Sequence, residues 1–133
     1  MPLDVVAMQI NSGYVRDCVI NCIDAFTLSG DTQHLYMAVE LFRNMLGCDT
    51  ATLLLEASKH FEEGANKYGE NNWQKGIPTH CYIDSAVRHY LKWLRGDDDE
   101  PHDRAFVWNL LCCIWTCEHI PEMDDYRKET END

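Results

Sequence analysis

Acidic side chains with helical spacing, and a histidine among them, stand near the middle of this 133-residue chain. Glu56, His60 and Glu63 are four and three residues apart, so they would share one face of a helix. Glu62 would lie beside that face. Carboxylates that face inward from packed helices are typical ligands of Mg²⁺ or Mn²⁺. A solvated acidic surface is the other interpretation of Glu62 and Glu63.

A second acidic segment, DDDE from Asp97 to Glu100, precedes Asp103. Glu100 and Asp103 form an ExxD pair, which on a helix places both carboxylates on one face, one turn apart. The segment predicts an acidic helix start with Pro101 in the first turn, because negative charge stabilises a helix N-terminus. Two hypotheses follow: helix capping and solubility alone, or an oxygen-rich metal site shared with the first segment.

Charged residues also form a stripe along residues 80–95, at spacings of four, four and three: Asp84, Arg88, Lys92 and Arg95. One interpretation is a helix surface with Asp84–Arg88 pairing, which contributes about 0.3–0.5 kcal/mol. The other is a stripe that binds phosphates beside a metal site, with Arg88 and Lys92 neutralising their charge. The sequence leaves both interpretations open.

The stretch GANKYGENNWQKGIP, residues 64–78, carries more special residues than a connection between helices needs. Its glycines would let the backbone approach a ligand, its asparagines would make polar contacts, and Trp73 could stack on a nucleobase. A rigid, self-packed loop is the alternative. Asn109 lies in an apolar segment and must be hydrogen-bonded, by the protein or by a ligand. His89 and His102 could bind metal, but most single histidines do not.

Apolar residues recur with a period near 3.6, which predicts an all-α protein, and no alternating run predicts a strand. We expect a four-helix core with one extra N-terminal helix. The single globular domain would comprise N-terminal helices in 1–48, a helical core in 49–120 and a solvated, frayed acidic tail in 121–133. The last helix is apolar on nearly all sides, so it should be central or at a subunit interface. The expected helices cover 14–28, 31–46 with Asp31 as N-cap, 51–68, 80–95 and 102–120.

Charge and cysteine content narrow the functional classes. The formal net charge of −12 argues against a nucleic-acid polymer as partner, whereas a few local cations could hold a free nucleotide. No apolar run approaches the roughly 20 residues of a membrane span, and no signal peptide is evident. We therefore expect no membrane partner and a cytoplasmic location. The seven cysteines lack zinc-finger spacing and are expected to be free thiols.

Two stretches carry a family resemblance: FEEGANKYGENNWQKGIP, residues 61–78, and YIDSAVRHYLKWLRGDDDEPHDRAFVWNLLCCIWT, residues 82–116. They resemble the phage and bacterial dATP/dGTP diphosphohydrolase-like family, whose pattern runs GA-x-KYG-x-x-NW-x-x-G, then D-S/A-A-x-RH, then G-D/E-x-D-x-x-H. That family is similar to the MazG-like group of all-α NTP pyrophosphohydrolases. The resemblance covers residues 52–118 and does not extend to the N-terminal helices.

The resemblance implies a four-helix-type MazG-like core and a homo-oligomer, a dimer or tetramer, that depends on Mg²⁺ or Mn²⁺. It implies cleavage of a nucleoside triphosphate, here a purine dNTP, between the α and β phosphates, which gives a monophosphate and pyrophosphate. MazG-like enzymes carry EExxE on one helix and ExxD on a later one. In this chain Asn66 stands where the last glutamate of the first motif is expected.

Roles for individual residues follow from the same resemblance. The catalytic residues would be Glu62, Glu63, Glu100 and Asp103. The metal ligands would be Glu63, Glu100, Asp103 and Asp84, with Glu56 as another possible source of a missing ligand. The nucleotide would contact Lys67, Asn71, Asn72, Trp73, Lys75, Arg88, Lys92 and Asn109.

Two other classes of function stay open at this point. A phage could use such a pocket to sequester a nucleotide signal of the host's defence without hydrolysing it, in which case the protein would act in the host cytoplasm. The incomplete first motif and the unmatched N-terminal helices keep this alternative open. A helical interaction protein that kept the fold and lost the site is the third class, and it predicts no metal-dependent stabilisation by nucleotides.

Overall fold

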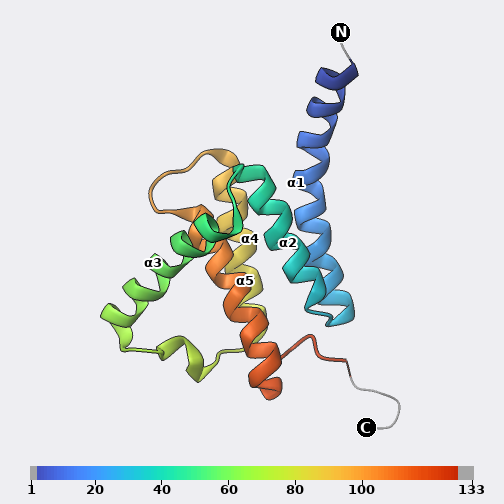
Figure 1. Cartoon of the computed structure of the whole chain (residues 1–133). Coiled ribbons are helices and arrows are strands. Elements are labelled where there is room, and N and C mark those ends of the chain that lie inside the picture. The colour runs from blue at the N-terminus through green and yellow to red at the C-terminus, as the bar shows by residue number, and fades with distance from the viewer. Residues whose placement is uncertain (1–2, 129–133) are drawn as a thin grey trace.

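The computed structural model describes the backbone of residues 3–128 and the side chains of residues 13–128 (Figure 1). Within that part of the chain the fold is all-α, as predicted, and it contains no strand. Five α-helices and two short 3₁₀ helices follow one another as α1 (Leu3–Ser29), α2 (Gln33–Leu46), α3 (Thr50–Tyr68), η1 (Asn72–Lys75), α4 (Thr79–Arg95), α5 (His102–His119) and η2 (Pro121–Met123).

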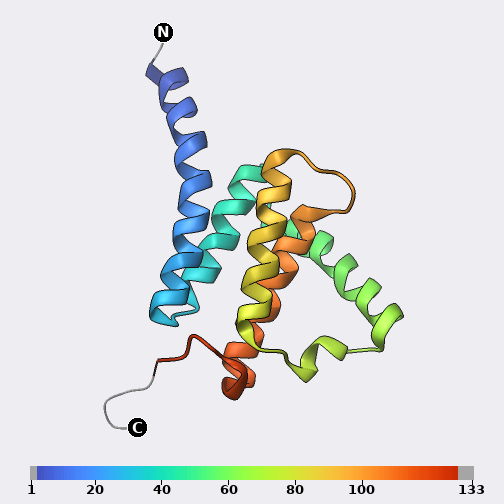
Figure 2. The same cartoon turned by 180° about the vertical axis from the view of Figure 1, so that it is seen from behind.

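Two helix pairs and one separate helix make up the architecture. α1 packs along α2, α4 packs along α5, and α5 also contacts α2 and α3. α5 is therefore central, which confirms one of the two positions expected for it. The first half of α1 extends beyond the other helices, and α3 diverges from the α4–α5 pair toward its C-terminal end (Figures 1 and 2). η1 then brings the chain back to the start of α4 (Figure 2).

Aromatic side chains fill the core where α2 meets the α4–α5 pair. Phe42 on α2 makes edge-to-face contacts with Phe106, Trp93 and Tyr90, at ring-centroid distances of 4.7, 4.9 and 6.0 Å. Phe42, Tyr90 and Phe106 are all fully buried. Such rings bury large apolar areas, so this cluster anchors three helices to one another.

Local signals in the sequence set most helix ends. Gly96 ends α4 in the left-handed conformation (φ 89°), and its N–H reaches the carbonyls of Lys92 and Trp93. Asp49 caps α3, because its side chain accepts a hydrogen bond from the Thr52 N–H at 2.7 Å. Each of these ends lies within one residue of its predicted place, because glycine tolerates this conformation and aspartate satisfies a free helical N–H.

The predicted N-cap of α2 is wrong in detail, and the acids expected in the first turn of α5 precede that helix. Asp31 accepts a hydrogen bond from the Gln33 N–H at 2.9 Å, but the residue in the N-cap position is Thr32. The segment 97–100 lies in the loop before α5, which begins at His102. Glu100 and Asp103 therefore do not share a helix face. The loop forms because its acids bind cationic and imidazole side chains nearby rather than the N–H groups of α5.

The tail is also more ordered than expected over its described part. Tyr126 packs edge-to-face on Phe26, with 5.2 Å between ring centroids. The Asp125 N–H donates to the Thr79 hydroxyl at 3.0 Å, and its carboxylate contacts the His80 ring at 2.6 Å. These partners at the ends of α1 and α4 hold residues 121–128, whereas residues 129–133 lie outside the described part of the chain.

No described helix combines the length and the hydrophobicity that a membrane span requires.

Candidate functional site

A cavity of about 770 Å³ lies between α3, η1, α4 and α5. Its walls are mostly aromatic and apolar, and lysines, a glutamate and amides add a small number of polar groups. This combination is typical of a binding pocket for a small organic molecule. The walls include Phe61, Trp73, Tyr82 and Trp108, and the polar groups include His60, Glu63, Lys67, Asn72, Lys75, Ser85 and Asn109.

The loop between α3 and α4 positions Trp73 as a wall of this cavity. Asn71 adopts a left-handed backbone conformation (φ 58°), and asparagine tolerates this conformation better than most residues other than glycine. The 3₁₀ helix η1 starts at the next residue. The Trp73 ring then packs edge-to-face against Phe61 and Trp115, at centroid distances of 5.1 and 5.0 Å. Trp73 therefore bridges α3 and α5, and it both lines the cavity and packs on the core.

Two buried polar atoms on the cavity residues have no protein partner in the described part of the chain. They are His60 Nδ1 and Trp108 Nε1, and the two rings lie 5.2 Å apart. Buried polar atoms are normally hydrogen-bonded, so each is a candidate for contact with a bound ligand. Asn109 is 6% exposed and donates from Nδ2 to the Ala105 carbonyl at 2.8 Å. That bond engages only part of its amide, which has two donors and an acceptor.

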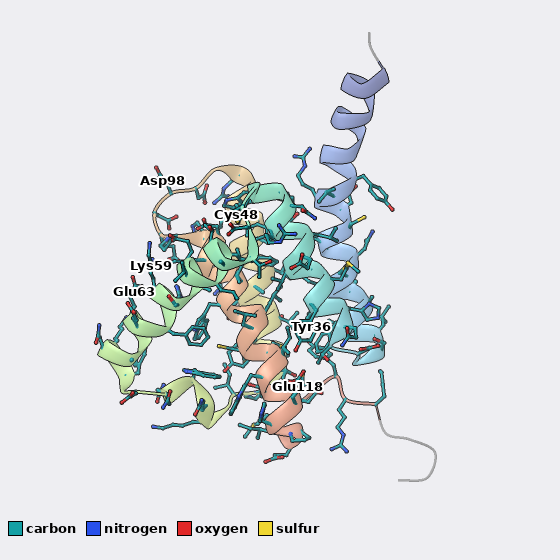
Figure 3. All side chains as sticks on the ribbon, in the orientation of Figure 1. Tyr36, Cys48, Lys59, Glu63, Asp98 and Glu118 are labelled. Atoms are coloured by element: carbon teal, nitrogen blue, oxygen red, sulfur yellow. The ribbon has the colours of Figure 1, made fainter. Side chains whose placement is uncertain are left out.

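An ion pair neutralises Glu63, the glutamate that lines the cavity. Glu63 on α3 (Figure 3) accepts a hydrogen bond from Arg104 on α5. Burial, with the nearby Arg104 charge, lowers the pKa of His60, while Glu63 and Glu100 act in the opposite direction. Burial also raises the pKa of Tyr82 to about 12, so its hydroxyl stays protonated at neutral pH. The cavity therefore holds neutral rings, and Lys67 and Lys75 are its exposed cations.

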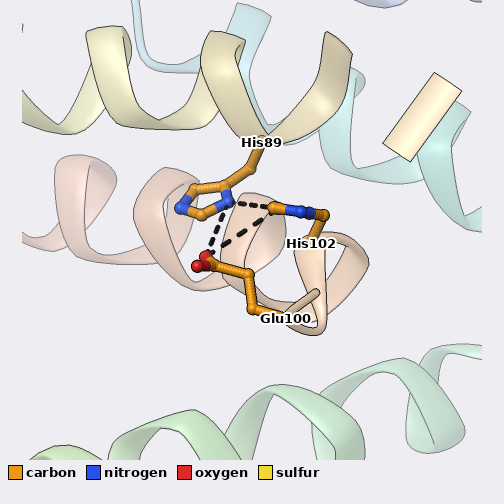
Figure 4. Close-up of side chains that lie close together, drawn as sticks. All are labelled: His89, Glu100 and His102. Atoms are coloured by element: carbon orange, nitrogen blue, oxygen red, sulfur yellow. Dashed lines mark hydrogen bonds and ion pairs between the residues drawn. The ribbon is translucent and has the colours of Figure 1, made fainter. Parts of the chain in front are cut away.

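A second group of functional side chains lies where α4 ends and α5 begins (Figure 4). His89 on α4 and His102 on α5 bring their Nδ1 atoms to 2.8 Å from each other. Glu100 Oε1 is 3.3 Å from the Nδ1 of His89 and 3.8 Å from that of His102. We call these three residues the histidine cluster. Imidazole nitrogens and a carboxylate at such distances are able to share a cation.

Neighbouring acids of the loop surround the histidine cluster. Asp99 Oδ1 lies 2.7 Å from His102 Nε2, and this hydrogen bond lowers the pKa of Asp99. Arg95 donates to Asp97 at 2.8 Å and thereby lowers the pKa of Asp97. Burial of the ring is the main cause that lowers the pKa of His89. The His102 side chain is fully buried, which holds its ring in one place.

The cavity and the histidine cluster share two helices. Ser85 lines the cavity and His89 follows it by four residues, which is about 6 Å along α4. Asn109 lines the cavity and His102 precedes it by seven residues, about 10 Å along α5. Because residues at these spacings lie on one side of a helix, the histidine cluster lies beyond one end of the cavity. Glu100 also contributes to the electrostatic environment of His60, a cavity residue.

The structure brings together about half of the predicted site residues. Glu63, Lys67, Asn72, Trp73, Lys75 and Asn109 all line the cavity. Glu100 belongs to the histidine cluster instead. Asn71 and Glu62 are exposed and do not line the cavity.

The remaining predicted residues lie elsewhere. Asp84, Arg88 and Lys92 line an open groove along another face of α4, together with Arg95, so the predicted stripe exists but does not face the cavity. Asp103 lies in a small pocket with Arg104 and Glu56, and Glu56 pairs with Lys59 at 2.7 Å. The predicted metal set of Glu63, Glu100, Asp103 and Asp84 is thus spread over separate places.

Three residues that form or support the histidine cluster were given too little weight in the sequence-based predictions: His89, His102 and Asp99. The two histidines are 13 residues apart, and each is unremarkable alone. The signal was present in the pattern D-S/A-A-x-RH followed by G-D/E-x-D-x-x-H, in which they occupy fixed places. The antiparallel pairing of α4 and α5 is what brings these places together.

The fold and the site define a helical domain with an aromatic pocket whose size and lining suit a small molecule, and with a potential metal cluster beside that pocket. The chain belongs to the family described as dATP/dGTP diphosphohydrolase, N-terminal, whose sequence model matches residues 37–126. The match covers α3 to η2, with most of α2, so the cavity and the histidine cluster both lie within it. No curated protein and no solved structure is significantly similar to the chain. The name of the family describes a hydrolase that acts on dATP and dGTP.

Proposed function

We propose that this protein hydrolyses a purine deoxynucleoside triphosphate to the monophosphate and pyrophosphate, with the help of a divalent cation. Water would attack the α-phosphorus, the bond from that phosphorus to the oxygen bridging to the β-phosphorus would break, and pyrophosphate would leave. The observation that supports this most is the aromatic cavity with amide and lysine groups inside the region that matches the family.

The cavity would hold the base and sugar. Trp73, Trp108 and Tyr82 offer apolar ring surfaces, and a volume of about 770 Å³ accommodates a purine nucleoside. The Asn109 amide and the Asn72 amide would contact polar edges of the base or sugar. The unpartnered Trp108 Nε1 is a further donor for such a contact. Asn71 would act on this loop through its backbone conformation rather than by contact.

The phosphates would extend from the cavity toward the histidine cluster. Lys67 and Lys75 at the cavity would attract the negative charge. Glu63 lines the cavity and Glu100 belongs to the cluster, so these are the two carboxylates that we propose contribute to catalysis by orienting water and substrate. The donor set of the cluster suits a divalent cation, which when bound would neutralise phosphate charge and lower the pKa of a water molecule.

The test is an incubation of the purified protein with a panel of dNTPs and NTPs, with Mg²⁺ or with Mn²⁺, followed by chromatography. We expect a monophosphate and pyrophosphate from dATP or dGTP, and at least a tenfold lower rate in Glu100→Gln. Asp98→Asn is the matched control, because Asp98 is an exposed acid of the same loop and belongs to neither potential metal group (Figure 3). Wild-type protein that turns over no nucleotide would overturn the proposal.

Sequestration of a nucleotide without hydrolysis is the second candidate. It is favoured by the position of Glu63, which pairs with Arg104, and by the distribution of the predicted metal ligands over separate places. The same incubation distinguishes the two candidates. Nucleotide that is recovered intact after the complex is denatured would support sequestration.

We further propose that the protein forms a homo-oligomer in the cytoplasm. Apolar side chains are exposed on α3 and α4, in particular Leu54, Leu55 and Leu91. The sequence suggested α5 as a subunit interface, but α5 is buried within the chain. The exposed leucines are therefore the surface on which the proposed association now rests. All seven cysteines are free, which suits a reducing compartment. Static light scattering that gives a particle of the mass of one chain would contradict the oligomer.

A further inference from the structure

We propose that His89 Nδ1, His102 Nδ1 and Glu100 Oε1 form a binding site for one divalent first-row transition-metal ion, of the Mn²⁺, Co²⁺ and Zn²⁺ class, in preference to Mg²⁺. The metal ligands assigned from the sequence were all carboxylates, and His89 and His102 were considered only as single histidines. The site stands on the geometry of the cluster and does not depend on nucleotide hydrolysis.

The spacing of the three atoms matches a metal coordination shell. They are 2.8, 3.3 and 3.8 Å apart (Figure 4). Ligands about 2.1 Å from one ion lie about 3.0 Å apart at right angles and about 3.4 Å apart at tetrahedral angles. The observed separations bracket these two values, so a shift of a few tenths of an ångström is enough to seat an ion.

Asp99 fixes the state of His102 that a metal needs. Its carboxylate accepts from the Nε2–H of His102 at 2.7 Å, so a neutral His102 presents an unprotonated Nδ1 to the other two ligands. A carboxylate that holds the far nitrogen of a ligating histidine is the usual second layer of a metal site. A neutral His89 whose proton is on Nε2 completes the pair of nitrogen donors.

The position of the cluster favours a preformed and accessible site. The His102 side chain is fully buried and the His89 side chain is 13% exposed, so both rings are held by the packing of α4 on α5. The Glu100 side chain is 49% exposed, which leaves a solvent side for entry. Three protein ligands leave coordination positions for water or a phosphate oxygen.

The donor atoms select the type of ion. Mg²⁺ prefers an all-oxygen octahedron and retains its waters, whereas two imidazoles with one carboxylate bind divalent transition metals, the later ones such as Co²⁺ and Zn²⁺ more tightly than Mn²⁺. The only other potential metal group in the described part of the chain, Asp97, Asp99 and His102, uses the opposite nitrogen of His102. That group is the weaker choice, because Arg95 already neutralises Asp97 and Nε2 already donates to Asp99.

The experiment is a metal titration of the full chain after chelation and removal of the chelator. Co²⁺ binding is followed by its visible absorption, and bound Mn²⁺ is counted by electron paramagnetic resonance. We expect one ion per chain, at least tenfold weaker binding in Glu100→Gln, and loss of the site in His89→Ala. Asp98→Asn should bind like the wild type. A millimolar excess of Mg²⁺ should leave Co²⁺ in place.

Glu100→Gln keeps the test decisive if His89→Ala does not fold, because Glu100 lies on the loop with half of its side chain exposed. Circular dichroism shows whether each variant is folded. The proposal is overturned if the wild type binds no Co²⁺ or Mn²⁺, if folded Glu100→Gln binds both as tightly as the wild type, or if Mg²⁺ displaces Co²⁺ at similar concentration. Because only the metal ion is added, these outcomes are separate from the presence or absence of nucleotide hydrolysis.

Discussion

The α4–α5 pair and the arm formed by α3 and η1, residues 50–75, are built in opposite ways. Ten of the 18 residues of α5 are buried, and they contact neighbours on several sides. Only two of the 19 residues of α3 are buried, Leu53 and Ala57, and none of η1 is. Leu54, Leu55 and Tyr68 of the arm are exposed. The pair therefore supplies most of the packing energy, and the arm supplies one wall of the cavity.

The difference indicates that the two regions have separate roles in the site: the α4–α5 pair holds the histidine cluster, and the arm forms the part of the cavity that can open. The histidine cluster is held between the two tightly packed helices, as a preformed metal site requires. The cavity lies where the less buried arm meets those helices, and elements of low local stability are the ones that open for ligands. Four predictions test this division, from the largest expected effect to the smallest.

Truncating the core of the pair should have the largest effect. Phe106 is fully buried, and its ring lies 4.7 Å from that of Phe42 and 5.1 Å from that of Tyr90. Phe106→Ala should lower the free energy of unfolding by about 3–5 kcal/mol, measured by urea denaturation. Leu55→Ala in the arm removes a side chain that is 68% exposed, so it should change that free energy by less than about 0.5 kcal/mol. Equal losses in both variants would contradict the proposed division.

Removing the tryptophan of the arm should affect binding more than folding. Because one base–aromatic stack contributes about 1–3 kcal/mol, Trp73→Ala should weaken binding of dGMP about 10- to 100-fold in isothermal titration calorimetry. The loss in unfolding free energy should be smaller than that of Phe106→Ala, since Trp73 is only partly buried. Trp73→Phe keeps an aromatic face and should recover part of the affinity. Unchanged affinity with a large loss of stability would make Trp73 a core residue only.

Most of the fold could be predicted because its signals are local. Gly96 and Asp49 end and begin helices through interactions within one turn, and the period of apolar residues defines which side of each helix is buried. The acids 97–100 were expected at the start of the last helix, but they lie in the loop before it, where Asp97 binds Arg95 and Asp99 binds His102. The predicted fraying of residues 121–128 failed because Asp125 finds partners on α4, more than 40 residues earlier in the chain.

The site was less predictable, because it depends on how helices pair. The family resemblance grouped Trp73 with Lys75 at the nucleotide, and both residues line the cavity. Arg88 and Lys92 were grouped with them, although the apolar side of α4, which includes Ile83 and Tyr90, leaves these cations on another face. The histidine cluster needs α4 and α5 to be antiparallel and in register, which no local pattern specifies.

A loss of helix capping should loosen the arm alone. Asp49 satisfies the Thr52 N–H at the start of α3, and removing such a cap costs about 1 kcal/mol. Asp49→Ala should therefore increase amide hydrogen exchange in residues 50–68 and leave the exchange of α4 and α5 unchanged, as measured by mass spectrometry. Asp49→Asn preserves an acceptor and is the matched control. Exchange that rises equally in all helices would mean that the arm unfolds only together with the pair.

Acidification should produce the smallest effect, and it reports on both regions. Burial lowers the pKa of His60 in the arm and of His89 on α4, so just below the ordinary histidine pKa of about 6.5 the unfolded chain binds more protons than the folded chain. Stability should therefore fall as the pH decreases through 6.5. The lowered pKa values of Asp49 and Asp99 act only nearer to their ordinary value of 3.8. These two aspartates stabilise the folded state above that pH, and their contribution is lost as the pH falls below it.

Urea denaturation between pH 7.5 and about 5, in the presence of a chelator, measures the histidine contribution without that of the aspartates. The double variant H60Q/H89Q should have a flatter profile than the wild type. The single variants show which histidine causes the pH dependence of stability. If His60→Gln alone flattens the profile, the effect arises where the arm contacts Trp108. If His89→Gln alone flattens it, the effect arises within the α4–α5 pair. A wild-type protein that is equally stable across this range would contradict the prediction, because it would show that burial lowers the pKa of neither imidazole in the folded state.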